Sequence, residues 1–362
     1  MHAPRLNVFL LFILMITAVL LTNGCSDDDD NNPVTPAGEW SWSPLGAGLN
    51  NTVVTAGVYD NLLIVGGSFT TAGDTAATRI ASWNGSTWAP LGSGLDNGPI
   101  CFSQWDNKLI VAGNFVTAGG VTVNHVAAWD GSSWQALGSG VDDVAKSLAV
   151  YDNKLFVGGN FSFAGDVRVG GIAYWDGSAW ARPGTNMTGR INQLTVYDNK
   201  LIAAGFMSLN EGAWADRVVA WDGSTWSSLG AAMDGEVYSF TVYDGKLIAG
   251  GLFTVAGGVS ADNLAAWDGT SWAPLGPGMD SSVTSLIVFD NELVAAGYFP
   301  GIGGTPFDHI ATWNGSAWDS LGTGIQSRPF ASAIYDNDLV VAGTMTSAGD
   351  STVQNIAAWG LH

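Results

Sequence analysis

The stretch Trp83-Asn84-Gly85-Ser86-Thr87-Trp88 decides the fold of this chain, because the sequence returns to it at a fixed interval. A Trp, an Asp or Asn, a Gly and a second Trp five positions after the first recur every 46 residues. The other complete copies have their two Trp residues at Trp129 and Trp134, Trp175 and Trp180, Trp221 and Trp226, Trp267 and Trp272, and Trp313 and Trp318. An unbroken array of equal units indicates one repeat body rather than several independent domains.

The seventh copy is divided between the two ends of the chain. It begins at Trp359 and stops before its second Trp, and the matching residue is Trp42, which lies 46 residues before Trp88. We therefore expect the segment Trp40 to Leu45 to supply the last strand of the last unit. Such sharing would close the array into a ring without free sheet edges. An open solenoid is the alternative.

One unit is predicted to contain four short strands. In residues 99–144 the Asp130-Gly131 pair predicts a two-residue hairpin turn between the last two of them. The predicted strands are Pro99–Trp105, Lys108–Phe115, His125–Trp129 and Ser133–Leu137. Four antiparallel strands per unit are typical of a propeller blade. The sequence therefore predicts an all-β, seven-bladed β-propeller over residues 39–362.

The pattern within the unit resembles known propeller repeats. Gly66-Gly67 at the end of the second strand, followed by aromatic residues on the third and fourth strands, resembles the kelch type. The fuller pattern, seen in Gly113-Asn114-Phe115 and Trp129-Asp130-Gly131, is similar to the repeats of fungal cortical cell-polarity markers and of uncharacterised bacterial surface proteins. It departs from kelch in repeat length and aromatic spacing. The resemblance implies the fold and says little about the ligand.

The N-terminus has the pattern of an export signal. Arg5 precedes an apolar run from Val8 to Leu21, and Gly24 precedes Cys25. This end resembles the signal of bacterial lipoproteins, although Leu21 lies one place early and Asn23 is atypical. The resemblance implies a signal peptide over residues 1–24, lipidation of Cys25 and anchoring in a lipid bilayer. Ordinary secretion is the alternative.

Residues 25–38 are predicted to form a solvated tether. Asp27 to Asp30 are four adjacent carboxylates that repel one another, and Pro33 and Pro36 follow. The acidic run also resembles the surface-export signal of some diderm bacterial lipoproteins, and a plain linker is the alternative. We expect a lipid-anchored protein of the bacterial cell envelope, at the outer membrane or the cell surface.

The composition limits the classes of partner. The chain has 12 basic and 32 acidic residues and a formal charge of −20, which argues against nucleic-acid binding. It has two cysteines. With Cys25 lipidated, Cys101 has no partner and no disulfide is expected. We expect a monomer.

We look for a binding site where the copies differ, because a Trp present in every unit is expected to pack the blade. The fourth repeat departs most, in the loop between its second and third strands, and Trp214 is outside the repeat pattern. An aromatic residue with arginine and carboxylate neighbours suits a sugar or a peptide. The candidate ligand-binding residues are Phe206, Glu211, Trp214, Arg217, Arg168 and Arg190. A loop that packs on its own Trp is the alternative.

A second candidate site lies in the segments that cross from unit to unit. Carboxylates at equivalent positions that converge on a channel mouth could bind Ca²⁺, which prefers oxygen ligands. These residues are Asp96, Asp142, Asp234 and Asp280. Asp is also a common turn residue, which is the alternative explanation.

Catalytic residues are not evident. His125 and His309 share one repeat position, which suggests a role in ordering the loop, and Cys101 replaces small residues of the other copies. No nucleophile–base pair or cluster of metal ligands is visible, so we expect a protein without enzymatic activity. The hypothesis is a membrane-anchored extracytoplasmic module that binds a glycan or a protein. The alternatives are a polysaccharide hydrolase or lyase, and a structural envelope protein.

Overall fold

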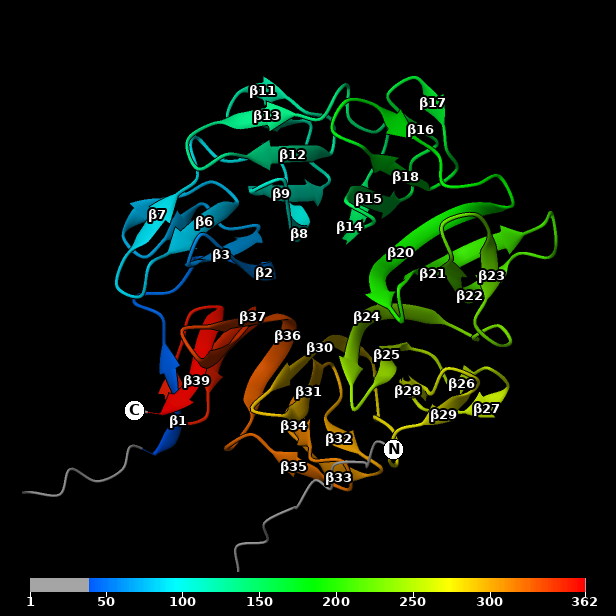
Figure 1. Cartoon of the computed structure of the whole chain (residues 1–362). Helices are drawn as coiled ribbons and strands as arrows, with labels where there is room; N and C mark the ends of the chain where they lie inside the picture. The colour runs from blue at the N-terminus through cyan, green and yellow to red at the C-terminus, as the bar shows by residue number, and fades with distance from the viewer. Residues whose placement is uncertain (1–38, 362) are drawn as a thin grey trace, which may run out of the picture. The chain divides into compact units, whose positions relative to one another are not determined.

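The computed structural model describes residues 39–361 and contains seven four-stranded antiparallel blades arranged in a ring (Figure 1). The predicted fold is therefore confirmed. The described residues form strands, turns and loops, and none of them belongs to a helix that could span a membrane. The predicted signal peptide, Cys25 and the tether lie outside the described residues.

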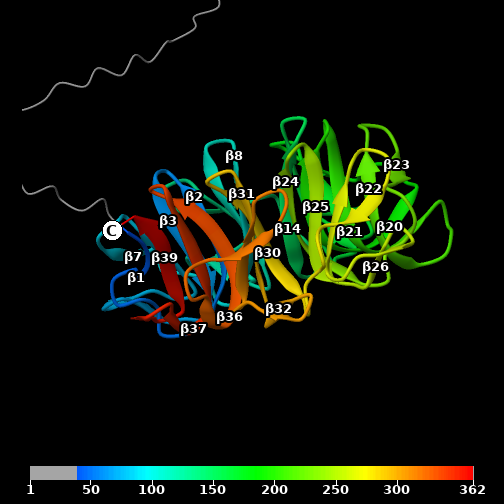
Figure 2. The ribbon, with the colours of Figure 1, turned by 90° about the horizontal axis from the view of Figure 1, so that it is seen from below.

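The four strands of each blade follow one another from the ring axis to the rim, and Figure 2 shows the ring edge-on. The innermost strands are β2 (Val53–Tyr59), β8 (Pro99–Trp105), β14 (Ala145–Tyr151), β20 (Met187–Tyr197), β24 (Glu236–Tyr243), β30 (Val283–Phe289) and β36 (Ile325–Tyr335). The second strands are β3 (Leu62–Gly67), β9 (Lys108–Gly113), β15 (Lys154–Gly159), β21 (Lys200–Leu209), β25 (Lys246–Leu252), β31 (Glu292–Gly297) and β37 (Asp338–Ala348).

The outer half of each blade carries the two Trp residues of the repeat. The third strands are β6 (Ile80–Trp83), β12 (Val126–Trp129), β18 (Ile172–Trp175), β22 (Ala215–Trp221), β28 (Leu264–Trp267), β34 (Ile310–Trp313) and β39 (Ile356–Leu361). The outermost strands are β7 (Trp88–Pro90), β13 (Trp134–Ala136), β19 (Trp180–Ala181), β23 (Trp226–Ser228), β29 (Trp272–Pro274), β35 (Trp318–Ser320) and β1 (Trp40–Pro44).

The ring closes as the split repeat predicts. Strand β1, the first described strand, pairs with β39, and Trp42 lies directly opposite Trp359. The seventh blade thus takes its outermost strand from the start of the propeller, next to strands from its end (Figure 1). The outermost strands are two to five residues long, so the sheet edges that remain at the rim are short.

In five of the seven blades, the loop between the second and third strands contains a short hairpin that was not expected. In the second blade the turn Gly119-Gly120 has φ values of 58° and 83°, which glycine adopts without strain. The hairpins are β4 (Thr71–Ala72) with β5 (Thr75–Ala76), β10 (Thr117–Ala118) with β11 (Val121–Thr122), β16 (Phe163–Ala164) with β17 (Val167–Arg168), β26 (Val255–Ala256) with β27 (Val259–Ser260), and β32 (Gly301–Ile302) with β33 (Thr305–Pro306). In the seventh blade β38 (Ser351–Thr352) pairs with the extended β37.

The prediction of a two-residue turn at Asp130-Gly131 is wrong. Trp129 pairs with Trp134, so four residues form the turn, and the Asp130 carboxylate accepts the amides of Ser132 and Ser133 at 2.9 and 2.8 Å. This side-chain cap is what the Asp or Asn of the motif provides. The two-residue turn of the blade is Asp106-Asn107, where both residues have positive φ, as a type I′ turn requires.

In six of the seven blades, a Trp of the repeat makes a hydrogen bond to the blade before it. Trp175 and Trp180 lie opposite each other with ring centroids 5.3 Å apart, and Trp180 Nε1 donates to the carbonyl of Leu137 at 2.8 Å. Leu137 belongs to the segment that crosses from the preceding blade. The same donation, to a carbonyl 43 residues earlier, is made by Trp88, Trp134, Trp226 and Trp272. Across the closure, Trp42 donates to Leu321. The structural role expected for the repeated Trp therefore includes a directional bond between blades.

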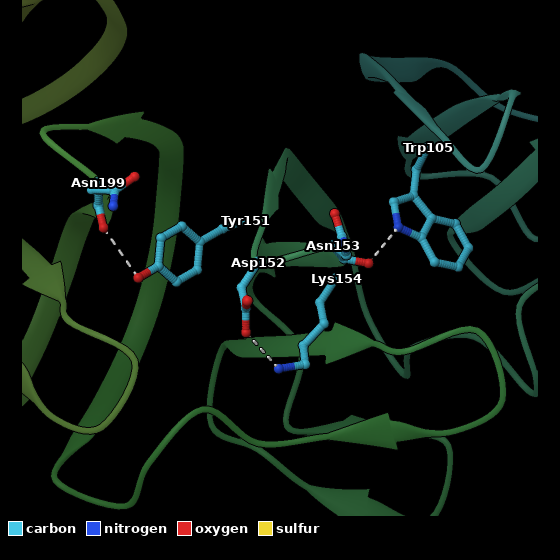
Figure 3. A network of polar contacts seen from close by, with 6 residues as sticks. All are labelled: Trp105, Tyr151, Asp152, Asn153, Lys154 and Asn199. Atoms are coloured by element: carbon cyan, nitrogen blue, oxygen red, sulfur yellow. Dashed lines mark hydrogen bonds and ion pairs between the residues drawn. The ribbon is translucent and has the colours of Figure 1, made fainter.

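A second set of bonds joins neighbouring blades at the turns between the first and second strands. Tyr151 donates its hydroxyl to the carbonyl of Asn199, which is 48 residues later, at 3.2 Å (Figure 3). In the second blade, Trp105 occupies the position that Tyr151 holds in the third blade. Its Nε1 donates to the carbonyl of Asn153 at 3.1 Å (Figure 3). An indole N–H thus substitutes for a phenol O–H at this position.

Replacement of Trp180 by Phe tests the bond between blades. The variant Trp180→Phe leaves the buried carbonyl of Leu137 without its donor, and the matched control is Trp318→Phe, because Trp318 Nε1 is buried without a partner. Both changes shorten the same ring system. We expect Trp180→Phe to lower the free energy of unfolding by about 1–3 kcal/mol more than Trp318→Phe, measured by chemical denaturation. Equal losses would contradict this role of the indole.

The turn carboxylates predict a loss of stability in acid. Backbone amides of the same turn, with Ser and Thr hydroxyls, lower the pKa of Asp222 and Asp268 to about 2. Because the unfolded value is about 3.9, their stabilising contribution is complete above pH ~4 and is lost as the pH falls towards 2. Asn84 and Asn314 make the same bonds without titrating. We expect Asp268→Asn to weaken the pH dependence of the unfolding free energy between about pH 4 and pH 2. An unchanged dependence would contradict the assignment.

Candidate functional site

The fourth blade has no short hairpin at its outer loop. Strands β20 and β21 continue for 11 and 10 residues, and β21 and β22 are joined through Asn210 and Glu211, which both have positive φ. Arg217 lies within β22, whereas its equivalents His125 and His309 have φ values of 72° and 65° in the loop. These histidines therefore occupy a left-handed loop position. In the fourth blade the strand continues instead, so the sheet extends beyond its neighbours (Figure 1).

The extension carries an exposed aromatic pair. Phe206 and Trp214 stack with ring centroids 5.7 Å apart and an interplanar angle of 25°. The two residues are 45% and 52% exposed, whereas the Trp pairs of the blades are mostly buried. Arg190 lies opposite Phe206 in the β20–β21 register, and Arg217 donates to the carbonyl of Ala213 at 3.1 Å. Four of the six candidate residues thus lie on this extension, with Arg217, opposite Gly205, on the other face of the sheet from Phe206.

The other two candidates lie at a cavity between the third and fourth blades. Its volume is about 600 Å³, and Arg168, Arg182 and Glu211 line it with asparagine, serine and threonine side chains. Ser208 also lines the cavity and is two positions from Phe206, so their side chains leave β21 on the same side. The cavity therefore reaches the extended part of β21 that also carries Phe206, and it offers both signs of charge.

Arg182 was not predicted as a site residue. Its Nη2 donates to the carbonyl of Met187 at 2.8 Å, and its Nε is buried without a partner among the described residues. The sequence signal was present, because the equivalent position of other repeats holds Pro, Ala or Ser. It was missed because the cavity forms where two blades pack together, which the sequence of a single repeat does not show.

The carboxylates of the crossing segments accept hydrogen bonds from backbone amides of the loops. Asp142 accepts the backbone amides of Ser162 and Phe163, both at 2.8 Å, and so fastens the start of the β16–β17 hairpin. Asp96 and Asp234 make equivalent bonds, whereas Asp280 accepts the amide of Gly304, in the turn of the β32–β33 hairpin, at 3.2 Å. Partial burial raises the pKa of Asp96, but hydrogen bonds from the backbone amides of Thr117 and Val116 lower it by more than burial raises it. The net shift of the pKa is therefore downward. This capping gives the recurring carboxylates a structural role. Among the described side chains, no three His, Cys, Asp or Glu residues are grouped to hold a metal ion.

A second cavity, of about 480 Å³, lies on the ring axis and is lined by residues of all seven innermost strands. Each of these strands has a β-bulge at the same repeat position, and a bulge redirects the side chain that it carries. The bulge residues are Val54, Ile100, Lys146, Asn192, Tyr238, Thr284 and Phe330. No two copies carry the same residue here. That variation was the available sequence signal, and it was not used.

Cys101 follows a bulge and lies half-buried on the wall of this cavity. Desolvation raises the pKa of its thiol to about 12, although the thiol accepts the backbone amide of Leu148 in the next blade. Ser147 and Ser239 accept the amides of Leu194 and Leu286 in the same way, at 2.9 and 3.0 Å. Cys101 thus supplies one of the hydrogen bonds that join neighbouring blades.

Comparisons with known proteins agree with this architecture. Residues 132–293 match a family model described as the Rax2 C-terminal beta propeller domain, and residues 104–127 match a beta-propeller domain of unknown function, DUF5122. The chain is a β-propeller. These matches cover the middle of a repeat array that continues on both sides. No curated protein matches the chain. The resemblance to the kelch type stays a prediction.

Solved structures share the fold at low sequence identity. The computationally designed protein Ika8 has a TM-score of 0.50 and 18% identity over 87% of this chain and 98% of its own. An extracellular domain from B. thetaiotaomicron, described as part of a one-component system, has a TM-score of 0.55 and 10% identity over 88% of this chain. A second structure of the extracellular domain, described as part of a hybrid two-component system, has a TM-score of 0.54 and 10% identity over 89% of this chain. This chain spans 39% of each of those longer chains.

Substitution of Cys101 tests its bond to the next blade. Cys101→Ser keeps an acceptor for the Leu148 amide, as Ser147 and Ser239 do, whereas Cys101→Val removes it. We expect the valine variant to lose about 1–3 kcal/mol of unfolding free energy and the serine variant to lose less. Chemical denaturation of both proteins measures the difference. A serine variant as unstable as the valine variant would show that the thiol matters only for packing.

Proposed function

We propose that this propeller is a binding module that takes a glycan or a protein partner at the extended fourth blade. The observation that carries the proposal is the exposed stack of Phe206 on Trp214. Cys25 would hold the module outside the cytoplasm, at the outer membrane or cell surface, through a lipid anchor. The acidic segment 25–38 would hold the propeller away from the bilayer.

The exposed stack has a cost that a ligand would offset. Exposed aromatic surface is unfavourable in water, at roughly 25 cal/mol per Å² of apolar area, and large aromatics dominate the energetics of binding sites. Among the described residues, Trp214 and Trp40 are the tryptophans with a large exposed fraction, and Trp40 lies next to the tether. Trp214 contacts the ring of Phe206 on one side. Its remaining exposed surface is available to a partner.

The surroundings of the stack favour a ligand rich in hydroxyl or amide groups. Arg168, Arg182 and Glu211 offer donors and acceptors within the adjoining 600 Å³ cavity. Binding sites combine apolar surface with a few polar groups of this kind. A sugar presents a flat apolar face and hydroxyl groups, and an extended peptide presents apolar side chains and amides. Both fit this arrangement.

The experiment is a glycan-array screen of purified residues 38–362, combined with cross-linking on intact cells. Trp214→Ala removes the outer ring of the stack. Leu252→Ala is the matched control, because Leu252 occupies the position of Phe206 in the next blade and is 53% exposed. We expect Trp214→Ala to weaken binding about tenfold or more, since anchor residues contribute about 2 kcal/mol or more, and Leu252→Ala to bind normally.

The same screen distinguishes the other hypotheses. Binding that requires added Ca²⁺ would support a metal at Asp96, Asp142, Asp234 and Asp280. Ligand binding that is equally strong in Trp214→Ala would contradict a site on the fourth blade. A well-folded protein that captures neither glycan nor partner would contradict the binding-module proposal itself.

A further inference from the structure

The central cavity has two chemically different sides. In ring order, the bulge residues of the seventh, first and second blades are Phe330, Val54 and Ile100, which are all apolar. The third to sixth blades follow with polar bulge residues, namely Lys146, Asn192, Tyr238 and Thr284. All seven line the same cavity of about 480 Å³. The apolar and polar residues each form one continuous arc, so the cavity is amphipathic.

Lys146 is the cation of the polar arc. Its Nζ donates to the side-chain oxygen of Asn192 at 2.8 Å, and the residue is half-buried. Among the described side chains of residues 39–361, the single ion pair joins Lys154 to Asp152, on a turn. Among the described residues, no carboxylate therefore pairs with the Lys146 ammonium at salt-bridge distance. A partly desolvated charge of this kind favours an anionic ligand.

The charges around Lys146 limit what anion fits. Glu236 also lines the cavity. Burial, and to a smaller extent a hydrogen bond to the Glu236 side chain, raises the pKa of Tyr238 to about 12. The whole chain carries a formal charge of −20. A polyvalent anion such as a phosphate would be repelled by both. A single carboxylate needs one cation and hydrogen-bond donors beside it.

The apolar arc offers a surface for the rest of such a ligand. Ile100 is 37% exposed and Val54 is half-buried. The ring of Phe330 packs edge-on against Tyr298, with centroids 5.8 Å apart, and Arg328 lies 5.0 Å above the Tyr298 ring. These contacts hold Phe330 in place. Apolar surface presented to a cavity by three adjacent blades suits an aliphatic or aromatic group.

We propose that the central cavity binds a small monocarboxylate that carries an apolar group. The carboxylate accepts hydrogen bonds from Lys146 on the polar arc, and the apolar group packs on Phe330, Val54 and Ile100. The cavity volume lies within the range of about 300–1,000 Å³ that is usual for small-molecule sites. This site shares no lining residue with the fourth-blade cavity. A negative result at one of the two sites therefore does not bear on the other.

The test uses hexanoate and its neutral analogue hexanamide as probes of purified residues 38–362, with binding measured by calorimetry and ligand-observed NMR. Lys146→Met removes the charge and keeps the length of the side chain. Lys200→Met is the matched control, because Lys200 is an exposed lysine outside the cavity. We expect Lys146→Met to weaken hexanoate binding about tenfold or more, as a charged hydrogen bond predicts, and Lys200→Met to leave it unchanged. Hexanamide should bind both variants equally.

A second variant tests the apolar arc. Phe330→Ala should weaken hexanoate and hexanamide by a similar factor, because both carry the same chain. If Lys146→Met does not fold, as judged by its melting temperature, Lys146→Gln keeps a donor for Asn192 while it removes the charge. Hexanoate that does not bind the unmodified protein, or that binds Lys146→Met or Lys146→Gln as tightly as the unmodified protein, would overturn the proposal.

Discussion

The interaction on which the ring depends is a hydrogen bond from the indole of the outermost strand to a carbonyl of the preceding crossing segment, and six of the seven blades make it. Apolar contacts hold neighbouring blades together but are not directional, so they do not by themselves fix how the blades are rotated. The bond from Trp180 to Leu137 is directional and lies at the rim. Bonds such as Tyr151 to Asn199 act at the turn face, and Ser147 to Leu194 acts at the channel wall. The offsets of 43, 48 and 47 residues between the bonded residues place one bond at each level of the blade interface.

This bonding pattern imposes tight local requirements on the crossing segments. Gly138 lies beneath the Trp pair of the next blade with φ of 57°, and a Cβ atom there would come within 3.1 Å of the Trp175 ring. A glycine is therefore needed where the chain passes the indoles. Positions outside these contacts are free to vary. The bulge position of the innermost strand and the outer loop of the fourth blade are two such places, and both proposals for binding concern them.

The fold was predictable from the sequence because the constraints that set it are tied to residue types. Trp, Gly and Asp at fixed spacing define the blade, and the division of the last copy between Trp359 and Trp42 implies the closed ring. The bulges were not predictable in this way, because Val53-Val54-Thr55 has the pattern of an ordinary strand and a bulge changes the register rather than the residue types. The candidate site was proposed from Trp214, which departs from the repeat, and it stays a prediction. Its division between the exposed stack and the cavity with Arg182 depends on how two blades pack, and no single repeat encodes that.

The central claim is that bonds between blades make the seven blades one cooperative body. Hydrogen exchange of residues 38–362, followed by mass spectrometry under mildly destabilising conditions, tests it most directly. If the claim holds, the slowest-exchanging amides of the second strands in all seven blades, from β3 to β37, become labelled together in one opening event. Blades that become labelled in separate events, each with its own opening free energy, would contradict it and would show an array of nearly independent repeats.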